Sequence, residues 1–222
     1  MNELDFKIPL TTYFGEDKSA ALNFEFPFDF NRRRCDLLVS TCDSLIGVEI
    51  KSDLDNLDRL EDQLNSYYKC FNQIYVACGT KHYQKIRQMK GRFGIILISD
   101  GTLTVKRKAK IIKSLALMPI LDMCDKISLE KLSNLKYQNK SDLIMSIINN
   151  FSKEEIYRIY HLSIHEKVSR VYNAFLSKRR CNNQRRYHSP EPEINESRCI
   201  LIIFHKFCHP RNMDVRTNRN PI

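Results

Sequence analysis

The chain has 222 residues, an ordinary apolar content of 42% and a formal net charge of +10 at pH 7. This length predicts one core domain with a smaller extension, and no stretch approaches the roughly 20 apolar residues that a membrane span needs. The first ten residues carry Glu3, Asp5 and Lys7 in place of an apolar segment, so we expect no secretory signal. We therefore expect a cytoplasmic protein in which the eight cysteines are reduced.

The positive charge is unevenly distributed along the chain. Residues 1–100 contain 13 Lys and Arg against 15 Asp and Glu, a net charge of −2, whereas residues 101–222 contain 23 against 11, a net charge of +12. Such asymmetry favours a polyanionic partner, most often nucleic acid. An exposed basic surface or tail without a partner is the alternative, and charge alone does not separate the two.

The N-terminal region has a mixed pattern over residues 1–23, with a short helix predicted at 17–22. Residues 24–30 then alternate aromatic and polar side chains, which is typical of a half-buried strand. Pro27 lacks a backbone N–H, so it restricts this strand to the edge of a sheet or to a bulge.

The middle of the chain alternates strands with helices. Two strands joined by a turn at 41–44 predict a hairpin. The helix after it is expected to start near Asp53 or Asp55, because acidic residues suit a first helical turn. Helices between successive strands indicate parallel crossovers within a mixed sheet. The expected strands are residues 35–40, 45–51, 73–78, 93–99 and 103–106, and the expected helices carry the apolar stripe Leu57, Leu60, Leu64, Tyr67 and Phe71 and residues 81–89.

The pattern becomes helical from about Leu129. One helix is predicted at 139–151, and the Ser-x-x-Glu spacing at 152–155 predicts the start of a long helix that ends near 177–180. The expected organisation is a core at 1–110, a basic helical extension at 111–180, and a polar linker with a basic tail at 181–222.

The expected hairpin brings three charged residues to one face. With a four-residue loop at 41–44, Asp36 faces Glu49 across the hairpin with Cβ atoms roughly 4.5–5.5 Å apart. Lys51 lies two residues beyond Glu49 and shares its face. Two facing carboxylates repel each other, and a divalent cation that prefers oxygen ligands, Mg²⁺ or Mn²⁺, would relieve this repulsion. Such a site suits phosphodiester hydrolysis, in which the lysine orients water or stabilises negative charge.

A Glu-x-Lys pair in a strand is common, and alone it indicates only a surface ion pair. Here three segments, Arg34-Cys-Asp36, Gly47-Val-Glu-Ile-Lys-Ser-Asp53 and Arg59-Leu-x-x-Gln63, together resemble the PD-(D/E)XK nuclease superfamily, in particular a small branch found in bacteria and their phages. The resemblance covers roughly residues 32–99. It implies an α/β fold with the restriction-endonuclease-like αβββαβ core and a mixed sheet, followed here by a C-terminal helical extension.

This resemblance assigns roles to individual residues. It makes Asp36 and Glu49 metal ligands, with the backbone carbonyl of Ile50 as a further ligand, and makes Lys51 the catalytic lysine. Gln63 joins the catalytic set. The superfamily often draws another acidic residue from an N-terminal helix, and the candidates for it are Glu16 and Glu25, neither of which matches the pattern well.

Contacts with nucleic acid are expected from the nuclease-like segments and from a basic cluster farther along the chain. Gln63 and Tyr67 have the Gln-x-x-x-Tyr spacing of exonuclease-like members, so they would orient the lysine or contact DNA, with core packing as the alternative for Tyr67. A basic cluster after the last strand would neutralise phosphates, or else is a solvated linker. The expected nucleic-acid contacts are Arg34, Arg59, Tyr67, Lys106, Arg107, Lys108 and Lys110.

The expected function is a divalent-metal-dependent nuclease that hydrolyses phosphodiester bonds, with DNA as the expected substrate. Two alternatives stay open: a non-catalytic nucleic-acid binder on the same fold, and a protein-interaction module whose helical extension docks a partner or a second copy. The intact set of Asp36, Glu49 and Lys51 argues for the enzyme, because a decayed site should have lost one member.

Overall fold

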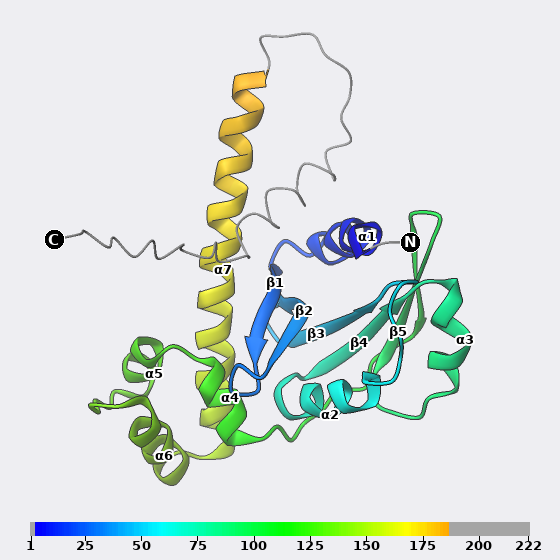
Figure 1. Ribbon diagram of the computed structural model, residues 1–222. Helices are drawn as coiled ribbons and strands as arrows, with labels where there is room; N and C mark the ends of the chain where they lie inside the picture. Colours follow the sequence, from blue (N-terminus) through cyan, green and yellow to red (C-terminus); the bar gives the residue numbers. More distant parts are fainter. Residues whose placement is uncertain (1–2, 187–222) are drawn as a thin grey trace, which may run out of the picture.

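The computed structural model describes residues 3–186, which form a six-stranded mixed sheet and seven helices (Figure 1). Of the tail predicted at 181–222, only 181–186 fall within the described residues. The strands are β1 (Ala21–Phe28), β2 (Arg33–Ser40), β3 (Leu45–Lys51), β4 (Gln73–Cys78), β5 (Gly94–Ser99) and β6 (Thr102–Arg107). The helices are α1 (Glu3–Gly15), α2 (Leu60–Cys70), α3 (Thr80–Gln88), α4 (Leu117–Met123), α5 (Lys126–Ser133), α6 (Lys140–Asn150) and α7 (Lys153–Arg186).

The strands follow one another across the sheet in chain order, from β1 to β6. The pairs β1–β2, β2–β3 and β5–β6 are antiparallel, whereas β3–β4 and β4–β5 are parallel. The parallel pairs are those joined through α2 and α3, as expected for strand–helix–strand crossovers. The predicted mixed sheet is therefore confirmed, and Pro27 lies in an edge strand as predicted.

The predicted register of the β2–β3 hairpin is also confirmed where the two strands pair. Ser40 is opposite Leu45, and the pairing continues in step as far as Leu37 and Val48. The turn at 41–44 is closed by a hydrogen bond from the Thr41 N–H to the Ser44 carbonyl. The paired positions end one step short of Asp36 and Glu49, so this end of the hairpin departs from a regular ladder.

Each face of the sheet is covered by helices, with α1 above it and α2 below it in Figure 1. Phe6 and Leu10 of α1 pack with Val48 and Ile50 of β3 in one buried cluster. The opposite face carries a larger cluster that includes the α2 stripe predicted from the sequence. Of that stripe, Leu60, Leu64, Tyr67 and Phe71 are buried, and Leu57 packs against them partly buried.

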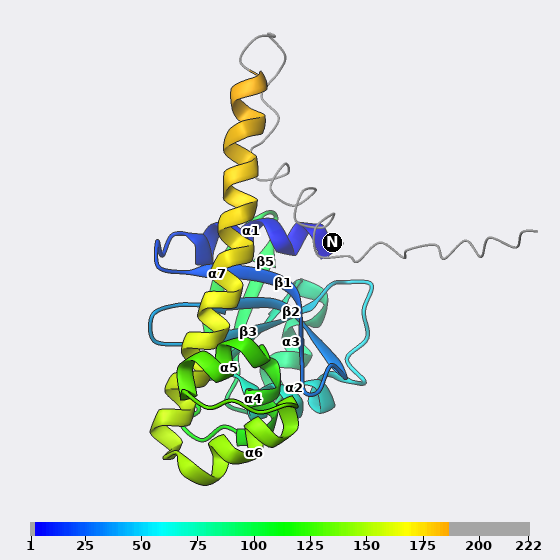
Figure 2. The ribbon, with the colours of Figure 1, turned by 90° about the vertical axis from the view of Figure 1, so that its left-hand side faces the viewer.

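The helices that follow the sheet share the larger cluster. In both ribbon views, α4, α5 and α6 gather around the first half of α7, which passes β1 and extends beyond the sheet (Figures 1 and 2). The buried Tyr160 hydroxyl of α7 donates to the carbonyl of Cys70 in α2 at 2.7 Å. The predicted capping box is confirmed, because the Ser152 N–H donates to Glu155 Oε2 at 2.8 Å and the Glu155 N–H to Ser152 Oγ at 3.3 Å.

The N-terminal helix was predicted in the wrong place. The structure has α1 at Glu3–Gly15 and no helix at 17–22, where Asp17 accepts hydrogen bonds from the N–H and hydroxyl of Ser19 and forms a turn. Pro9 inside α1 obscured this helix in the sequence. The Asp17 turn competes with a helix for the backbone donors.

Three other helix boundaries also differ from the prediction. Helix α2 begins at Leu60 and not near Asp53 or Asp55, because Asp55 Oδ2 accepts from the Ser52 N–H and hydroxyl, each at 2.7 Å, and holds a turn there. Helical structure after the sheet begins at Leu117 and not near Leu129. Helix α7 continues to Arg186, past the end predicted at 177–180, because no Gly or Pro interrupts it there.

No helix among residues 3–186 is both long and apolar enough to cross a membrane.

The packing of α2 on β3 generates a prediction about Gly47. A Cβ at Gly47 would lie 2.7 Å from Phe71 Cδ2 and 2.8 Å from Tyr67 Cδ1, so Gly47→Ala should push α2 off the sheet and lower the free energy of unfolding by about 1–3 kcal/mol. Urea denaturation would measure this loss. The matched control is Gly15→Ala, whose added Cβ would meet only Tyr172 Oη at 3.8 Å. Equal stability of both variants and the wild type would contradict this packing.

Candidate active site between strand β3 and helix α2

Glu49 is a buried carboxylate at the centre of the candidate site. It lies in β3, an interior strand, and only 2% of it is exposed. Three side chains satisfy its two oxygens: Tyr67 donates to Oε2 at 2.8 Å, Gln63 donates to Oε1 through its amide nitrogen, and Lys51 places Nζ 2.8 Å from Oε1. A buried carboxylate needs such partners, because an uncompensated charge in this environment is strongly unfavourable.

Lys51 closes a ring of contacts with Glu49 and Gln63. Its Nζ donates to Gln63 Oε1 at 2.9 Å, while the amide nitrogen of the same glutamine donates to Glu49. Gln63 therefore uses both ends of its amide, and this fixes its orientation. Lys51 is itself only 8% exposed, so its ammonium is held between a carboxylate and an amide oxygen.

Helix α2 supplies both helical members of this cluster from one face. Gln63 and Tyr67 are four residues apart, so they lie one above the other on the helix. Leu60 and Leu64 bury the adjoining positions in the core. Gly47, two residues before Glu49, leaves the space that the Tyr67 ring occupies. The sequence therefore places a polar pair inside an otherwise apolar contact.

Asp36 lies next to this cluster on β2. Asp36 as a whole residue is partly exposed, but its carboxyl group lies in a buried environment, where Oδ2 accepts a hydrogen bond from the backbone N–H of Ile50 at 2.7 Å. Burial of the carboxyl group and the negative charge of Glu49 hold the pKa of Asp36 well above its ordinary value, and Glu25 adds to this rise. Asp36 and Glu49 are thus close enough for their charges to interact, as the hairpin register predicts.

Strands β1 and β2 change faces at Glu25 and Asp36. The paired residues Phe24 and Leu37 belong to the core between the sheet and α1. The next pair, Phe26 and Cys35, belongs to the core on the other face, between the sheet and α2. Residues two apart on a regular strand share a face, so both strands are irregular here. Glu25 has a positive φ of 55°, which marks the irregularity.

The donors present fit a divalent cation in chemistry, although the carboxylates are few. Among residues 3–186, no group of three or more His, Cys, Asp and Glu side chains comes together to hold a metal ion. Asp36 and Glu49 supply two carboxylates whose mutual repulsion a cation would relieve. The remaining ligands would have to be backbone carbonyls, water or substrate, and the predicted role of the Ile50 carbonyl stays a prediction.

Two further acidic residues differ in their relation to the site. Glu16 is exposed beyond the end of α1. Glu25 is closer to the site, since its charge reaches Asp36, and its Oε1 lies 3.9 Å from Nζ of Lys7. Helix α1 therefore contributes a buried lysine near the site, and its acidic Glu3 pairs with that lysine at 2.6 Å. No local pattern in the sequence points to this contact.

The residues predicted to contact nucleic acid separate into three groups. Tyr67 is 0% exposed, so the expectation that it touches nucleic acid does not fit this structure, and its hydroxyl serves Glu49. Arg34 and Arg59 are exposed, Arg34 near the start of β2 and Arg59 directly before α2. Because β2 runs antiparallel to β3, the start of β2 lies at the same end of the sheet as Lys51.

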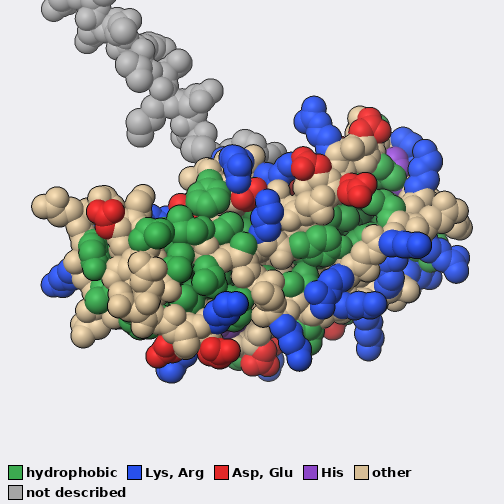
Figure 3. Space-filling model, turned by 90° about the horizontal axis from the view of Figure 1, so that it is seen from below, with side chains coloured by type: hydrophobic (Ala, Val, Ile, Leu, Met, Phe, Trp, Pro, Cys, Tyr) green, Lys and Arg blue, Asp and Glu red, His purple; other side chains and the backbone are tan. Residues whose placement is uncertain are grey.

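The basic cluster Lys106–Lys110 is not brought to this site. Arg107 pairs with Ile95, which is level with Glu49 along the sheet, so Arg107 is separated from the site sideways, by the three strand spacings between β3 and β6. Arg107 is also engaged locally, because its Nε donates to the Phe93 carbonyl at 3.0 Å. Figure 3 shows Lys and Arg side chains gathered towards the end of the molecule that holds α3 in Figure 1. Lys106, Lys108 and Lys110 are exposed.

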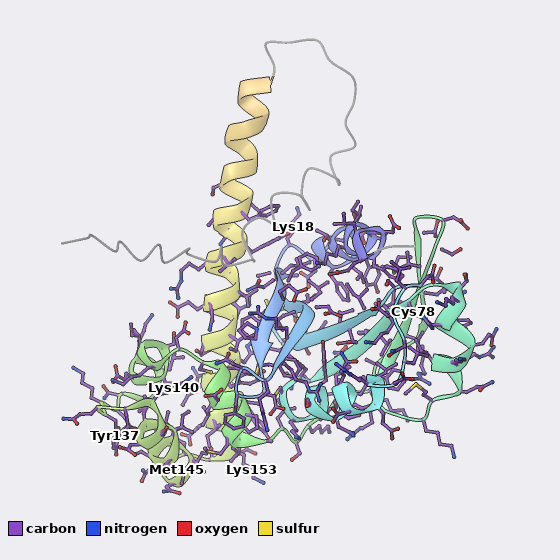
Figure 4. The ribbon with its side chains drawn as sticks, in the orientation of Figure 1. Lys18, Cys78, Tyr137, Lys140, Met145 and Lys153 are labelled. Atoms are coloured by element: carbon purple, nitrogen blue, oxygen red, sulfur yellow. The ribbon has the colours of Figure 1, made fainter. Side chains whose placement is uncertain are left out.

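The loop after β3 adds a contact that sequence reasoning missed. Asp53 lies against Gly79, where an added Cβ would meet its Oδ1 at 2.6 Å, and its backbone carbonyl accepts from Lys81 Nζ. Burial, with a contribution from the Asp53 charge, raises the pKa of Cys78 to about 12. Figure 4 labels Cys78 at the end of β4, where it pairs with Lys51. Asp53 thus holds the exit of β3 against the residues that directly follow β4.

Comparison with known proteins assigns the chain to a family. A family model described as Bacteriophage P4 protein cII matches residues 3–189, and the chain belongs to this family. The protein called cII from Enterobacteria phage P4 is 25% identical over 162 residues, which cover 68% of this chain and 61% of that protein. The chain therefore spans about three fifths of the length of that curated relative.

One solved structure resembles the chain distantly. It is the SPO1766 protein of unknown function from Silicibacter pomeroyi, with 11% identity and a TM-score of 0.42. The similarity covers 68% of this chain and 93% of that chain.

The raised pKa of Asp36 generates a prediction about stability. The folded state holds the proton on Asp36 to a higher pH than the unfolded chain does, so the stability falls as pH rises from the ordinary aspartate pKa to the raised one. Asp36→Asn keeps an acceptor for the Ile50 N–H and removes the charge. Without metal at neutral pH, it should stabilise the protein by about 1 kcal/mol, a gain that disappears at low pH.

Thermal unfolding followed from acidic to neutral pH, with and without Mg²⁺, would test this. Mg²⁺ should raise the Tm of the wild type and leave that of Asp36→Asn nearly unchanged. Asp43→Asn, at an exposed position in the 41–44 turn, is the control and should behave as the wild type. A loss of stability in Asp36→Asn at neutral pH would contradict the repulsion between Asp36 and Glu49.

Proposed function

We propose that this chain is a divalent-metal-dependent nuclease of the PD-(D/E)XK type that hydrolyses phosphodiester bonds in DNA. The observation that carries the proposal is the amide of Gln63, which bonds both Lys51 and Glu49. The nuclease resemblance joins these residues from two separate segments of the sequence. Their contact in the folded chain supports that reading over an unrelated surface Glu-x-Lys pair.

The burial of the cluster strengthens this proposal. Exposed ion pairs are common and carry little information, but Glu49 and Lys51 are both buried. Apolar residues of similar volume would often be at least as stable there, so a buried charged pair beside a second carboxylate is a candidate functional site. The chain order α1, β1, β2, β3, α2, β4 also agrees with the αβββαβ order of the superfamily core.

Asp36 and Glu49 would hold the cation, Mg²⁺ or Mn²⁺, with the Ile50 carbonyl as an additional oxygen donor. When bound, such an ion polarises a phosphoryl oxygen and lowers the pKa of a water molecule. To accept it, Glu49 must give up part of its present bonding, because both of its oxygens are engaged by Lys51, Gln63 and Tyr67.

Lys51 would supply a fixed positive charge to the reaction. Its ammonium is pre-oriented by Gln63 Oε1 and stands beside the proposed ligand Glu49. A charge held in place before the reaction stabilises the negative charge that develops on the phosphoryl group, without the cost of reorganising solvent. Gln63 is then a positioning residue, and Tyr67 holds the second oxygen of Glu49.

DNA is the proposed substrate on grounds of charge and position. Arg34 and Arg59 are exposed beside the end of the sheet where Lys51 lies. The exposed residues Lys106, Lys108 and Lys110 lie farther away, where they would bind phosphates along a longer duplex.

The direct test is cleavage of linear and circular DNA by purified protein with Mg²⁺, Mn²⁺ or EDTA. We expect metal-dependent cleavage that Lys51→Ala lowers by about 10²–10³-fold, because one charge that stabilises the transition state is lost. Gln63→Ala should lower it less, since the lysine stays in place but loses its orientation. Lys85→Ala, at an exposed position on α3, is the control for removing a lysine and should cut as the wild type.

The other outcomes separate the alternatives. Salt-sensitive DNA binding without cleavage under either metal would replace the proposal with a non-catalytic nucleic-acid binder. Absence of both binding and cleavage would favour a protein-interaction module that docks through the helical extension. Cleavage that Lys51→Ala leaves intact would show that the activity lies elsewhere in the chain.

A further inference from the structure

The turn between β1 and β2 has a backbone conformation that its residue types rarely adopt. Asp29, Phe30 and Asn31 have φ values of 48°, 59° and 59°, three consecutive positive values without a glycine. Side chains other than glycine disfavour this left-handed region, so such a run persists only where surrounding contacts hold it.

Those contacts come from a buried carboxylate and two arginines. Asp29 is buried, and its Oδ1 accepts from Arg32 Nη2 at 2.8 Å while its Oδ2 accepts from Ser66 Oγ at 3.2 Å. Arg33 Nε donates to the same Ser66 hydroxyl at 3.0 Å, and its guanidinium also pairs with Asp62. The turn is therefore fastened to helix α2.

The turn presents an aromatic ring to solvent. Phe30 is 42% exposed, and the guanidinium of Arg32 lies 5.4 Å from the centre of its ring. Arg32 itself is largely exposed outside its contact with Asp29. A partly exposed phenylalanine beside an arginine offers an apolar face and a positive charge at one place, which is the combination that binds a base and its phosphate.

This turn stands beside the proposed active site. Helix α2 bonds the turn through Asp62 and Ser66, and it bonds Glu49 and Lys51 through Gln63 and Tyr67. The turn leads directly into the start of β2, which lies at the end of the sheet where β3 reaches Lys51. One helix thus sets the position of the turn relative to the proposed catalytic lysine.

We propose that Phe30, with Arg32 beside it, is a stacking platform for an unpaired base of the nucleic acid whose backbone reaches Lys51. This inference rests on the proposed function and narrows its substrate class to single-stranded DNA, or to duplex DNA with a frayed or unpaired end. Base stacking on an aromatic side chain is tolerant of sequence, so the platform would prefer unpaired bases to paired ones without distinguishing one base from another.

Binding of a single-stranded oligonucleotide that contains 2-aminopurine tests the platform in EDTA, where nothing is cut. We expect Phe30→Ala to weaken this binding by about tenfold, Phe30→Trp to retain it, and binding of a blunt duplex to change by less than about twofold. The control is Tyr137→Ala, because Tyr137 is 39% exposed and Figure 4 shows it among the distant helices α5 and α6. It should bind as the wild type.

The result that overturns the platform is equal single-strand binding by Phe30→Ala and the wild type. An equal loss of duplex and single-strand binding would also overturn it, since that loss reports on charge or folding. If Phe30→Ala melts at a lower temperature, its loss of binding could come from unfolding. Phe30→Trp separates the two causes, because it keeps an aromatic ring in the turn. If Phe30→Trp binds single strands no better than Phe30→Ala, the aromatic ring does not stack on a base.

Failure of the platform and failure of the nuclease proposal remain distinguishable. If the wild type cuts DNA with metal and Phe30→Ala binds single strands as well as the wild type does, the nuclease proposal stands and the platform is overturned. Selective loss of single-strand binding in Phe30→Ala, in a protein that cuts nothing, would retain the platform on a nucleic-acid binder.

Discussion

The burial of the Glu49 carboxylate is the constraint on which the site depends. Glu49 lies in an interior strand of the sheet, is 2% exposed and bonds to two side chains of helix α2. Such a group is tolerable only with partners for both oxygens, and the chain supplies them from β3 itself and from α2. The approach of α2 in turn requires that position 47 have no side chain. The identities of several residues are therefore coupled through one charge.

The carboxylate of Asp36 beside that of Glu49 lowers the stability of the folded state, because the two negative charges repel each other. Lys51 compensates Glu49, whereas Asp36 accepts a hydrogen bond from the Ile50 N–H, and its pKa is raised by burial and by the charge of Glu49. Proteins rarely keep unresolved repulsion between carboxylates inside a fold unless the site has a task. A divalent cation would turn the repulsion into attraction, and the same cation would supply the chemistry that phosphodiester hydrolysis needs.

Much of this arrangement could be predicted from the sequence, because strand periodicity and loop length determine register. The four-residue loop at 41–44 fixed which residues of β2 and β3 are opposite each other, and the helical spacing of Gln63 and Tyr67 fixed their common face. Neither rule could give the turn at Ser52 and Asp55, where a side chain replaces a helical hydrogen bond.

Long-range contacts were the other source of error. The sequence left Tyr67 open between DNA contact and core packing, and the structure buries it where its hydroxyl donates to the buried Glu49. The irregularity at Glu25 depends on a positive φ, which could not be predicted because the residue is not a glycine. The bracing of Phe30 by Asp29 and Ser66 joins residues 37 positions apart, which no local pattern encodes.

The most direct test of this account is a crystal structure of the protein grown with Mn²⁺, whose anomalous scattering identifies the ion. We expect an anomalous peak coordinated by Asp36 and Glu49, with the contact between Gln63 and Glu49 opened and Lys51 Nζ still within reach of the site. A structure at saturating Mn²⁺ with no peak between the two carboxylates, and with the bonds of Glu49 to Lys51, Gln63 and Tyr67 intact, would contradict it.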